Sequence, residues 1–116
     1  MGDARPPGRR PARAGAEALD KRLWYIIAAT RGGINRARIL HALHERPHNA
    51  NDLASLLDLD YKTIRHHLDV LRENDCVMLF GDNSYAALYS LSPRLQFHFE
   101  EFLEIWERIN HGVGEK

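Results

Sequence analysis

The sequence predicts a mainly helical domain that carries one small β-hairpin, which is an α+β fold. Two patterns of apolar residues lead to this prediction. From residue 17 to residue 74, and again from residue 93 to residue 111, apolar residues recur with the period of helices that bury one face. Between these stretches, residues 76–91 alternate apolar with other residues on both sides of the turn-forming run Gly81-Asp82-Asn83-Ser84, as in a hairpin.

A chain of 116 residues is expected to form one domain. Residues 1–16 contain three prolines, four arginines and no large apolar residue after Met1. Such a segment cannot bury enough surface to fold alone, so it is predicted to be a disordered basic tail. The folded domain is predicted to span residues 17–116.

Two helices are expected at the start of the domain. The first spans residues 17–30, and the pair Gly32-Gly33 ends it, because glycine tolerates the left-handed conformation found after helices. The second helix spans residues 36–46, with Asn35 as its N-cap and Pro47 directly after its end.

The motif at residues 50–74 organises the rest of the domain. It is predicted to be a helix over residues 50–57, a turn at Asp58-Leu59-Asp60 and a second helix that ends near Asn74. Asn49 and Asp60 are the expected N-caps of the two helices. The second helix has one apolar face, formed by Ile64, Leu68 and Leu71. A short helix, a tight turn and a second helix together form a helix-turn-helix.

The polar face of the second helix points to DNA binding. In a helix-turn-helix, this helix enters the major groove of double-stranded DNA and reads bases with its N-terminal residues. Arg65 is the predicted reader of guanine O6 and N7. Arg31, Arg36 and Arg38 lie near the start of the 36–46 helix, where positive charge is unfavourable against the helix dipole. For each arginine, contact with a DNA phosphate and simple exposure to solvent explain its presence equally well. The predicted DNA-binding residues are Tyr61, Lys62, Thr63, Arg65, His66, Arg31, Arg36 and Arg38.

The hairpin follows the helix-turn-helix directly and is therefore predicted to be a wing at residues 76–91. It has no lysine or arginine between Cys76 and Ser92. Only Asn83, Ser84 and backbone N–H groups remain to contact phosphate, so we expect the wing to add little affinity.

The last predicted helix spans residues 93–111, with Ser92 as its cap and Pro93 at its first position. It has more apolar surface than so small a domain can bury, and its outer face is acidic. The simplest partner is the same helix of a second chain together with the 17–30 helix, which predicts a homodimer. The predicted dimerisation residues are Leu19, Leu23, Ile27, Leu95, Phe99, Phe102, Leu103, Trp106 and Ile109.

The run from Asp60 to Leu71 resembles the recognition helix of the ArsR family of winged helix-turn-helix transcriptional regulators, which carries a similar Thr-Val-Ser-His-His-Leu sequence. The run from Arg31 to Leu40 is similar to the archaeal branch of that family. The resemblance covers residues 20–110. It implies a homodimeric DNA-binding regulator with winged helices and separate N- and C-terminal dimerisation helices, and it places the DNA-reading positions at Tyr61, Lys62, Thr63, Arg65 and His66. A two-fold dimer predicts an inverted-repeat site.

The same comparison argues against a metal site. Many members of the family sense metal through a Cys-x-Cys pair in the first motif helix, which here reads Leu53-Ala54-Ser55-Leu56-Leu57. His98 and His111 lack the spacing of the family's second site. His66 and His67 point about 100° apart on a helix and cannot chelate one ion together. We expect no metal and no cofactor, with His66 toward DNA and His67 hydrogen-bonded under the wing.

Composition narrows the classes of function further. The net charge is +0, with a basic tail and an acidic last helix, so the total does not indicate a nucleic-acid binder. Cys76 is the only cysteine, as expected in a reducing cytoplasm, and is either a buried thiol or a redox switch through an intermolecular disulfide. The longest apolar run, Leu23–Ala29, is too short to span a membrane. No phosphate loop or nucleophile elbow is present, so an enzyme is not expected.

A second interpretation remains open. Winged helices also serve as protein-protein interaction modules without sequence-specific DNA binding, and the neutral charge and uncharged wing favour that interpretation. The presence of Lys62, Arg65 and His66 together on one helix favours DNA.

Overall fold

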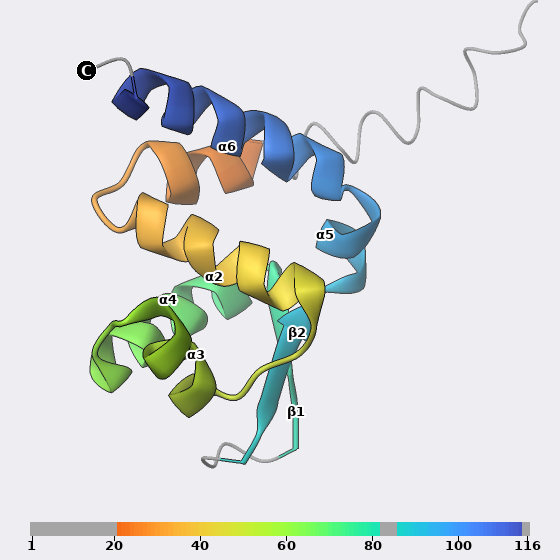
Figure 1. Ribbon diagram of the computed structural model, residues 1–116. Coiled ribbons are helices and arrows are strands. Elements are labelled where there is room, and N and C mark those ends of the chain that lie inside the picture. The colour runs from red at the N-terminus through yellow and green to blue at the C-terminus, as the bar shows by residue number, and fades with distance from the viewer. Residues whose placement is uncertain (1–20, 82–85, 115–116) are drawn as a thin grey trace, which may run out of the picture.

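The computed structural model describes residues 21–81 and 86–114, with side chains up to residue 109 (Figure 1). It is mainly helical with one antiparallel hairpin, which confirms the predicted fold class. A helical segment at residues 21–28 comes first. The elements that follow are α2 (Gly33–Glu45), α3 (Ala50–Leu57), α4 (Tyr61–Glu73), β1 (Val77–Phe80), β2 (Leu88–Leu91), α5 (Pro93–Phe97) and α6 (Phe99–Gly114).

Helix α2 lies at the centre of the fold (Figure 1). The 21–28 segment and α6 lie on one side of it, whereas α3 and α4 lie on the other, and the hairpin extends from the end of α2. One continuous core joins these layers. Its largest fully buried side chains are Leu23, Ile27, Ile39, Leu40, Leu53, Ile64, Leu68, Leu71, Tyr89, Leu95 and Phe102. Within the described residues, no helix is both long and apolar enough to cross a membrane.

The hairpin pairs Val77 with Leu91 and Phe80 with Leu88. Directly opposite residues share one face of a sheet, so the first pair faces the core and the second faces outward. Tyr89 is buried and forms a bridge with His48, in which their backbone groups exchange hydrogen bonds of 3.1 and 2.8 Å. This bridge ties the wing to the linker between α2 and α3.

Three of the predicted N-caps are confirmed. The Asn49 side chain accepts a hydrogen bond of 2.7 Å from the backbone N–H three positions later, at the start of α3. Asp60 accepts from two backbone N–H groups at the start of α4, at 3.1 and 3.3 Å. The Ser92 hydroxyl accepts from the Leu95 N–H at 3.1 Å and caps α5, which has Pro93 in its first turn. Side-chain capping is a local interaction, which is why sequence spacing predicts it.

The predicted start of α2 was wrong. The helix begins at Gly33, and Asn35 lies inside its first turn, where its Oδ1 accepts from Arg38 at 2.9 Å instead of capping the helix. A Cβ built on Gly33 would lie 1.7 Å from the carbonyl oxygen of Ile27. Only glycine allows the two backbones to approach this closely, so the glycine pair starts the second helix as well as ending the first.

The predicted single helix over residues 93–111 was also wrong, because the structure divides it at His98 into α5 and α6. His98 leaves helical geometry at φ −108° and ψ 29°. The break lets Leu95 pack beside the hairpin while Phe99 packs on α2 against the His44 ring. One straight helix cannot reach both surfaces.

Candidate nucleic-acid interface

Helix α4 is held in place by its buried face and by the turn that precedes it. Its buried face consists of Ile64, His67, Leu68 and Leu71. The turn before it closes through Asp58, which adopts the left-handed conformation at φ 58° and ψ 50°, where aspartate is tolerated. The turn and the Asp60 cap together fix where the exposed side of α4 begins.

The N-terminal half of α4 presents the side chains that sequence analysis assigned to DNA. Lys62 and His66 are exposed, whereas Tyr61, Thr63 and Arg65 are partly buried. The Arg65 guanidinium donates a 3.1 Å hydrogen bond to the Tyr61 hydroxyl and lies 5.9 Å from the centre of its ring. This hydrogen bond raises the pKa of Arg65. The guanidinium is therefore charged and pre-oriented along the helix.

The wing meets α4 through Tyr89. Burial raises the pKa of the Tyr89 hydroxyl, and the nearby positive charges of Arg65 and Arg72 partly oppose this effect. Asp69 lies close enough to Arg65 to support its charge, although more weakly than Tyr61 does.

The three arginines near the start of α2 occupy three different environments. Arg31 is exposed. Arg38 is partly buried, and its guanidinium donates to Asn35 Oδ1 at 2.9 Å and to the Leu57 carbonyl at 2.8 Å. Arg36 is only 5% exposed. Arg36 therefore cannot contact DNA in this conformation, and the prediction of a phosphate contact is corrected for it. Arg38 holds the end of α3.

Arg36 instead makes hydrogen bonds inside the protein. Its Nε donates to the Ile26 carbonyl at 3.0 Å, one terminal nitrogen donates to the Thr30 hydroxyl, and the other pairs with His67 Nδ1 at 3.0 Å. Burial and the charge of Arg36 lower the pKa of His67 to about 4. His67 was predicted to be hydrogen-bonded under the wing, but its ring is hydrogen-bonded to Arg36 on α2 instead. The adjacent glycine pair was the only sequence signal for this packing.

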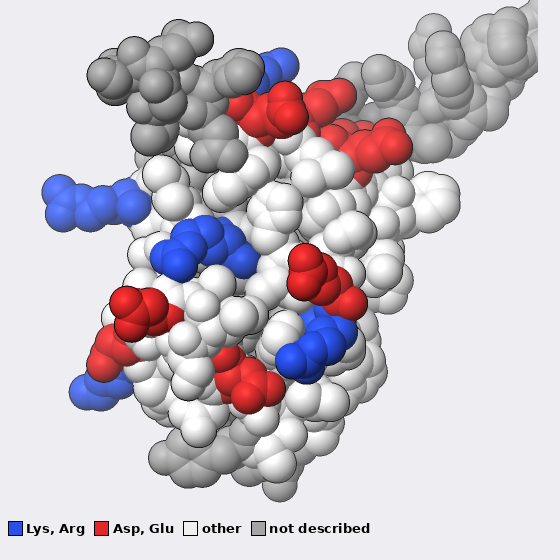
Figure 2. Space-filling model, in the orientation of Figure 1, with Lys and Arg blue, Asp and Glu red and all other residues white. Residues whose placement is uncertain are grey.

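The surface charge is mixed rather than basic. Figure 2 shows acidic side chains gathered over α6, whereas both signs alternate over α3 and α4. The exposed acidic residues of α6 include Glu100, Glu104 and Glu107. On the face shown, cationic groups are scattered, so any attraction for phosphate depends on a few side chains such as Lys62.

The described part of the wing carries no lysine or arginine. Its outward pair, Phe80 and Leu88, is apolar and 50% and 41% exposed. Asn83 and Ser84, the predicted phosphate contacts, lie outside the described residues. The described strands therefore give the wing an apolar outer face.

Most predicted dimerisation residues lie in the chain's own core, which is a correction. Buried there are Leu23, Ile27, Leu95, Phe99 and Phe102. The single chain covers them because the 21–28 segment and α6 pack on α2 within one subunit. Leu19 lies outside the described residues, Trp106 and Ile109 are partly buried, and Leu103 is 37% exposed.

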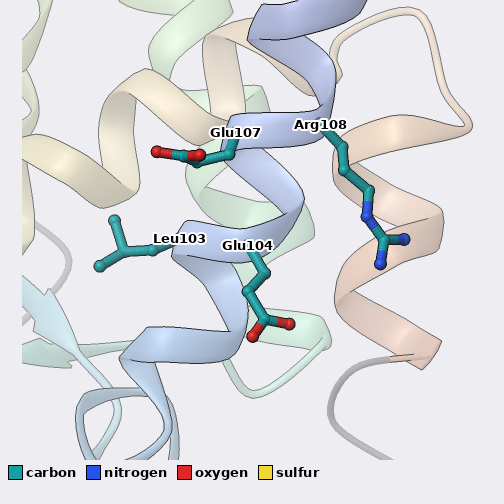
Figure 3. A pocket seen from close by; sticks show the side chains of 4 residues that line it. All are labelled: Leu103, Glu104, Glu107 and Arg108. Carbon is teal, nitrogen blue, oxygen red and sulfur yellow. The ribbon is translucent and has the colours of Figure 1, made fainter.

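Some large apolar side chains nevertheless remain exposed on the 21–28 segment and on α6. Trp24 and Tyr25 of that segment are exposed, the latter at 63%. In Figure 3, Arg108 points from α6 toward this segment, and its guanidinium lies 5.7 Å from the Trp24 ring centre. The described residues that line a hollow of about 510 Å³ all belong to α6, and three of the four are charged: Leu103, Glu104, Glu107 and Arg108. The exposed residues, rather than the buried stripe, are available to a second chain.

Cys76 is fully buried, and burial raises its thiol pKa to about 12. The thiolate, which is the reactive form, is therefore absent at neutral pH, and this favours the structural interpretation over the redox one. Among the described residues, no three histidine, cysteine or acidic side chains gather in a group that could hold a metal ion.

Residues 35–77 match the family model described as "Bacterial regulatory protein, arsR family". The matched segment runs from the first turn of α2 to the start of β1 and contains the whole helix-turn-helix. This segment is therefore similar to the helix-turn-helix of the ArsR family. The match covers less than half of the chain, and no curated protein sequence matches it significantly.

Solved structures show the same fold. The transcriptional regulator HlyU from Vibrio vulnificus is 22% identical, with a TM-score of 0.58 over 88% of this chain and 92% of that one. Mb0332 from Mycobacterium bovis, described as a homodimeric winged helix-turn-helix DNA-binding domain and a possible ArsR-family regulator, is 14% identical, with a TM-score of 0.57 over 100% and 96%. MarR from Staphylococcus aureus, in complex with salicylate and kanamycin, is 17% identical, with a TM-score of 0.56 over 71% of this chain.

These similarities confirm that the fold is a winged helix-turn-helix. This chain spans 57% of the MarR chain's length. The matching family model and the HlyU structure are both described as regulators.

Proposed function

We propose that this protein is a cytoplasmic transcriptional regulator of the ArsR family that binds double-stranded DNA sequence-specifically, as a homodimer on an inverted repeat. One observation carries the proposal. The helix-turn-helix that matches the family presents Lys62 and His66 at the surface of α4, with Arg65 held ready over Tyr61. The run from Arg31 to Leu40 supports a place in the archaeal branch.

The roles at the interface follow from side-chain geometry. A guanidinium can donate two parallel hydrogen bonds to guanine O6 and N7, and Arg65 is assigned to this contact. Lys62 is assigned to phosphate or a base, and Tyr61 and Thr63 to phosphate or a thymine methyl group. Arg31 is the exposed arginine assigned to flanking phosphate.

Dimerisation is needed because one α4 with few cations binds DNA weakly. We assign the interface to the apolar groups that the single chain leaves exposed, namely Trp24, Tyr25 and Leu103, with Trp106 and Ile109 beside them. The homodimeric state of the similar Mycobacterium bovis domain supports dimerisation. A two-fold dimer presents its two recognition helices about one DNA turn apart.

The second candidate function is a protein-protein interaction module. The neutral net charge and the apolar outer pair of the wing, Phe80 and Leu88, favour it. Such a module does not need a cationic reading helix, and its affinity for DNA would not depend on salt.

The test is a salt titration of binding to a random duplex, followed by selection of bound sequences from a random pool. The proposal predicts a log-log slope steeper than about −2, because each phosphate contact releases close to one counterion, and a selected inverted repeat. A slope near zero with no enriched sequence would contradict the proposal and favour the interaction module.

A further inference from the structure

The Arg36 side chain connects three parts of the chain. It starts on α2 and contacts the Ile26 carbonyl at the end of the 21–28 segment, the Thr30 hydroxyl in the following loop and His67 on α4. Each guanidinium nitrogen has one of these partners. A side chain that is 5% exposed and bonded to three elements holds those elements together.

The chemistry of this bridge requires a neutral His67. Arg36 donates to a carbonyl, a hydroxyl and an imidazole nitrogen, all uncharged. Since a guanidinium only donates, His67 Nδ1 must accept, which assigns the ring proton to Nε2. The titratable and charged groups that act on His67 are Arg36 of α2 and His66 of α4, and both disfavour its protonation.

The glycine pair makes room for the bridge. A Cβ built on Gly32 would lie 2.6 Å from His67 Cε1 and 3.0 Å from a terminal nitrogen of Arg36. Gly33 allows the start of α2 to reach the backbone of Ile27. The bridge therefore fits closely between the loop and α4.

The position of His67 on α4 gives the bridge a consequence for DNA reading. His67 directly follows His66 and lies two residues after Arg65. Successive helical residues point about 100° apart, so fixing the His67 ring fixes the rotation of α4 about its axis. That rotation determines where Lys62, Arg65 and His66 project.

We propose that Arg36 and His67 are positioning residues that set the orientation of the recognition helix relative to the 21–28 segment. This inference rests on the proposed DNA-binding function. Because Trp24 and Tyr25 of the same segment are assigned to the dimer interface, the bridge also sets the spacing between the two recognition helices. It thereby determines which half-site spacing the dimer prefers.

The matched variants are His67→Asn and His67→Leu. Asparagine keeps an acceptor at the position of Nδ1, whereas leucine has a similar volume and no acceptor. Arg46→Gln serves as control, because Arg46 is an exposed arginine just after α2 that the interface does not use. Each protein is titrated with the selected repeat, with the same repeat at altered half-site spacings and with random duplex, and the active fraction is measured by stoichiometric titration.

We expect His67→Leu to lower affinity for the selected repeat by about tenfold or more, with little change in random-duplex affinity, and to broaden the spacing preference. We expect His67→Asn and Arg46→Gln to stay close to wild type. A purely structural role would lower only the active fraction and leave the dissociation constant and spacing preference unchanged, which would overturn the inference. If His67→Leu and His67→Asn have the same affinity and spacing preference, the hydrogen bond between Arg36 and His67 does not determine them, and the inference is also overturned. If wild type itself shows no sequence preference, the proposed function fails, and the inference fails with it.

Discussion

Arginines lie in two regions of this molecule that resemble each other in sequence and differ in structure. In α4, Arg65 is partly exposed and supported by Tyr61, one turn earlier. At the start of α2, Arg36 is buried and serves as a connection between elements. Residue type alone therefore does not show whether an arginine is available to DNA. The packing around the side chain determines whether it is exposed, and at Arg36 that packing depends on the glycine pair.

The largest effect is expected at the close backbone crossing that keeps Arg36 buried. Gly33→Ala places a methyl group 1.7 Å from the Ile27 carbonyl oxygen, so the backbone must shift and the free energy of unfolding should fall by about 4 kcal/mol or more. Chemical denaturation measures this. The control is Ile34→Ala at the neighbouring exposed position, which should change stability by less than about 1 kcal/mol. A Gly33→Ala protein of normal stability would contradict the close approach of the Gly33 and Ile27 backbones.

The next-largest effect is a difference in stability between variants of the buried Arg36 and of the exposed Arg31 in the same region. Arg36→Ala leaves the Ile26 carbonyl and His67 without their buried donor and should lower the free energy of unfolding by about 2–4 kcal/mol. Arg31→Ala, at an exposed position, should change it by no more than about 0.5 kcal/mol. Equal losses in denaturant titrations of the two variants would remove the distinction between them.

The reverse pattern is expected for α4. Arg65→Ala should cost about 1–3 kcal/mol of binding free energy on the selected DNA site and relax base preference at one position. Lys62→Ala should weaken all sequences alike and reduce the salt slope by about one. Both are measured by anisotropy titration at several salt concentrations. If affinity and preference are unchanged in Arg65→Ala, Arg65 is not the base reader.

The smallest effect is a dependence of stability on pH. His67 has a folded-state pKa of about 4, below its ordinary value of 6.5, so the unfolded chain binds more protons between these values. Stability from this group is therefore complete above pH 6.5 and lost as the pH falls toward 4, by about 1–2 kcal/mol between pH 7 and pH 5.

Burial also lowers the pKa of His41 and His48, so the pH dependence of wild-type stability includes contributions from these two residues as well. The informative quantity is the difference between wild type and His67→Asn, measured by denaturation at each pH. The stability of wild type relative to His67→Asn should fall as the pH falls, because only wild type contains the titrating imidazole. A difference that is independent of pH would show that His67 is not held neutral by the fold.

Local interactions explain how much could be predicted from sequence. The helix-turn-helix, the wing and the caps at Asn49, Asp60 and Ser92 depend on neighbouring residues and on apolar period, and the structure has all of them. The burial of Arg36, by contrast, depends on residues from three elements that are distant in sequence. No local pattern distinguishes it from Arg31, which lies in the same run.

The dimerisation surface shows the same limit. The sequence predicted that the last helix has more apolar surface than so small a domain can bury, but the break at His98 and the packing on α2 bury much of it within one subunit. Only the packed structure separates Phe102, which is buried, from Leu103, which is exposed. The sequence predicted that apolar surface needs a partner and could not assign that partner to the same chain or a second one.

The central claim is that two copies of α4 read DNA as a two-fold pair. The most direct measurement is a hydroxyl-radical footprint of the 116-residue chain on the selected duplex. We expect two protected tracts on one face of the DNA, about one turn apart and related by two-fold symmetry. A single protected tract, or no protection under conditions where the protein is folded, would contradict it.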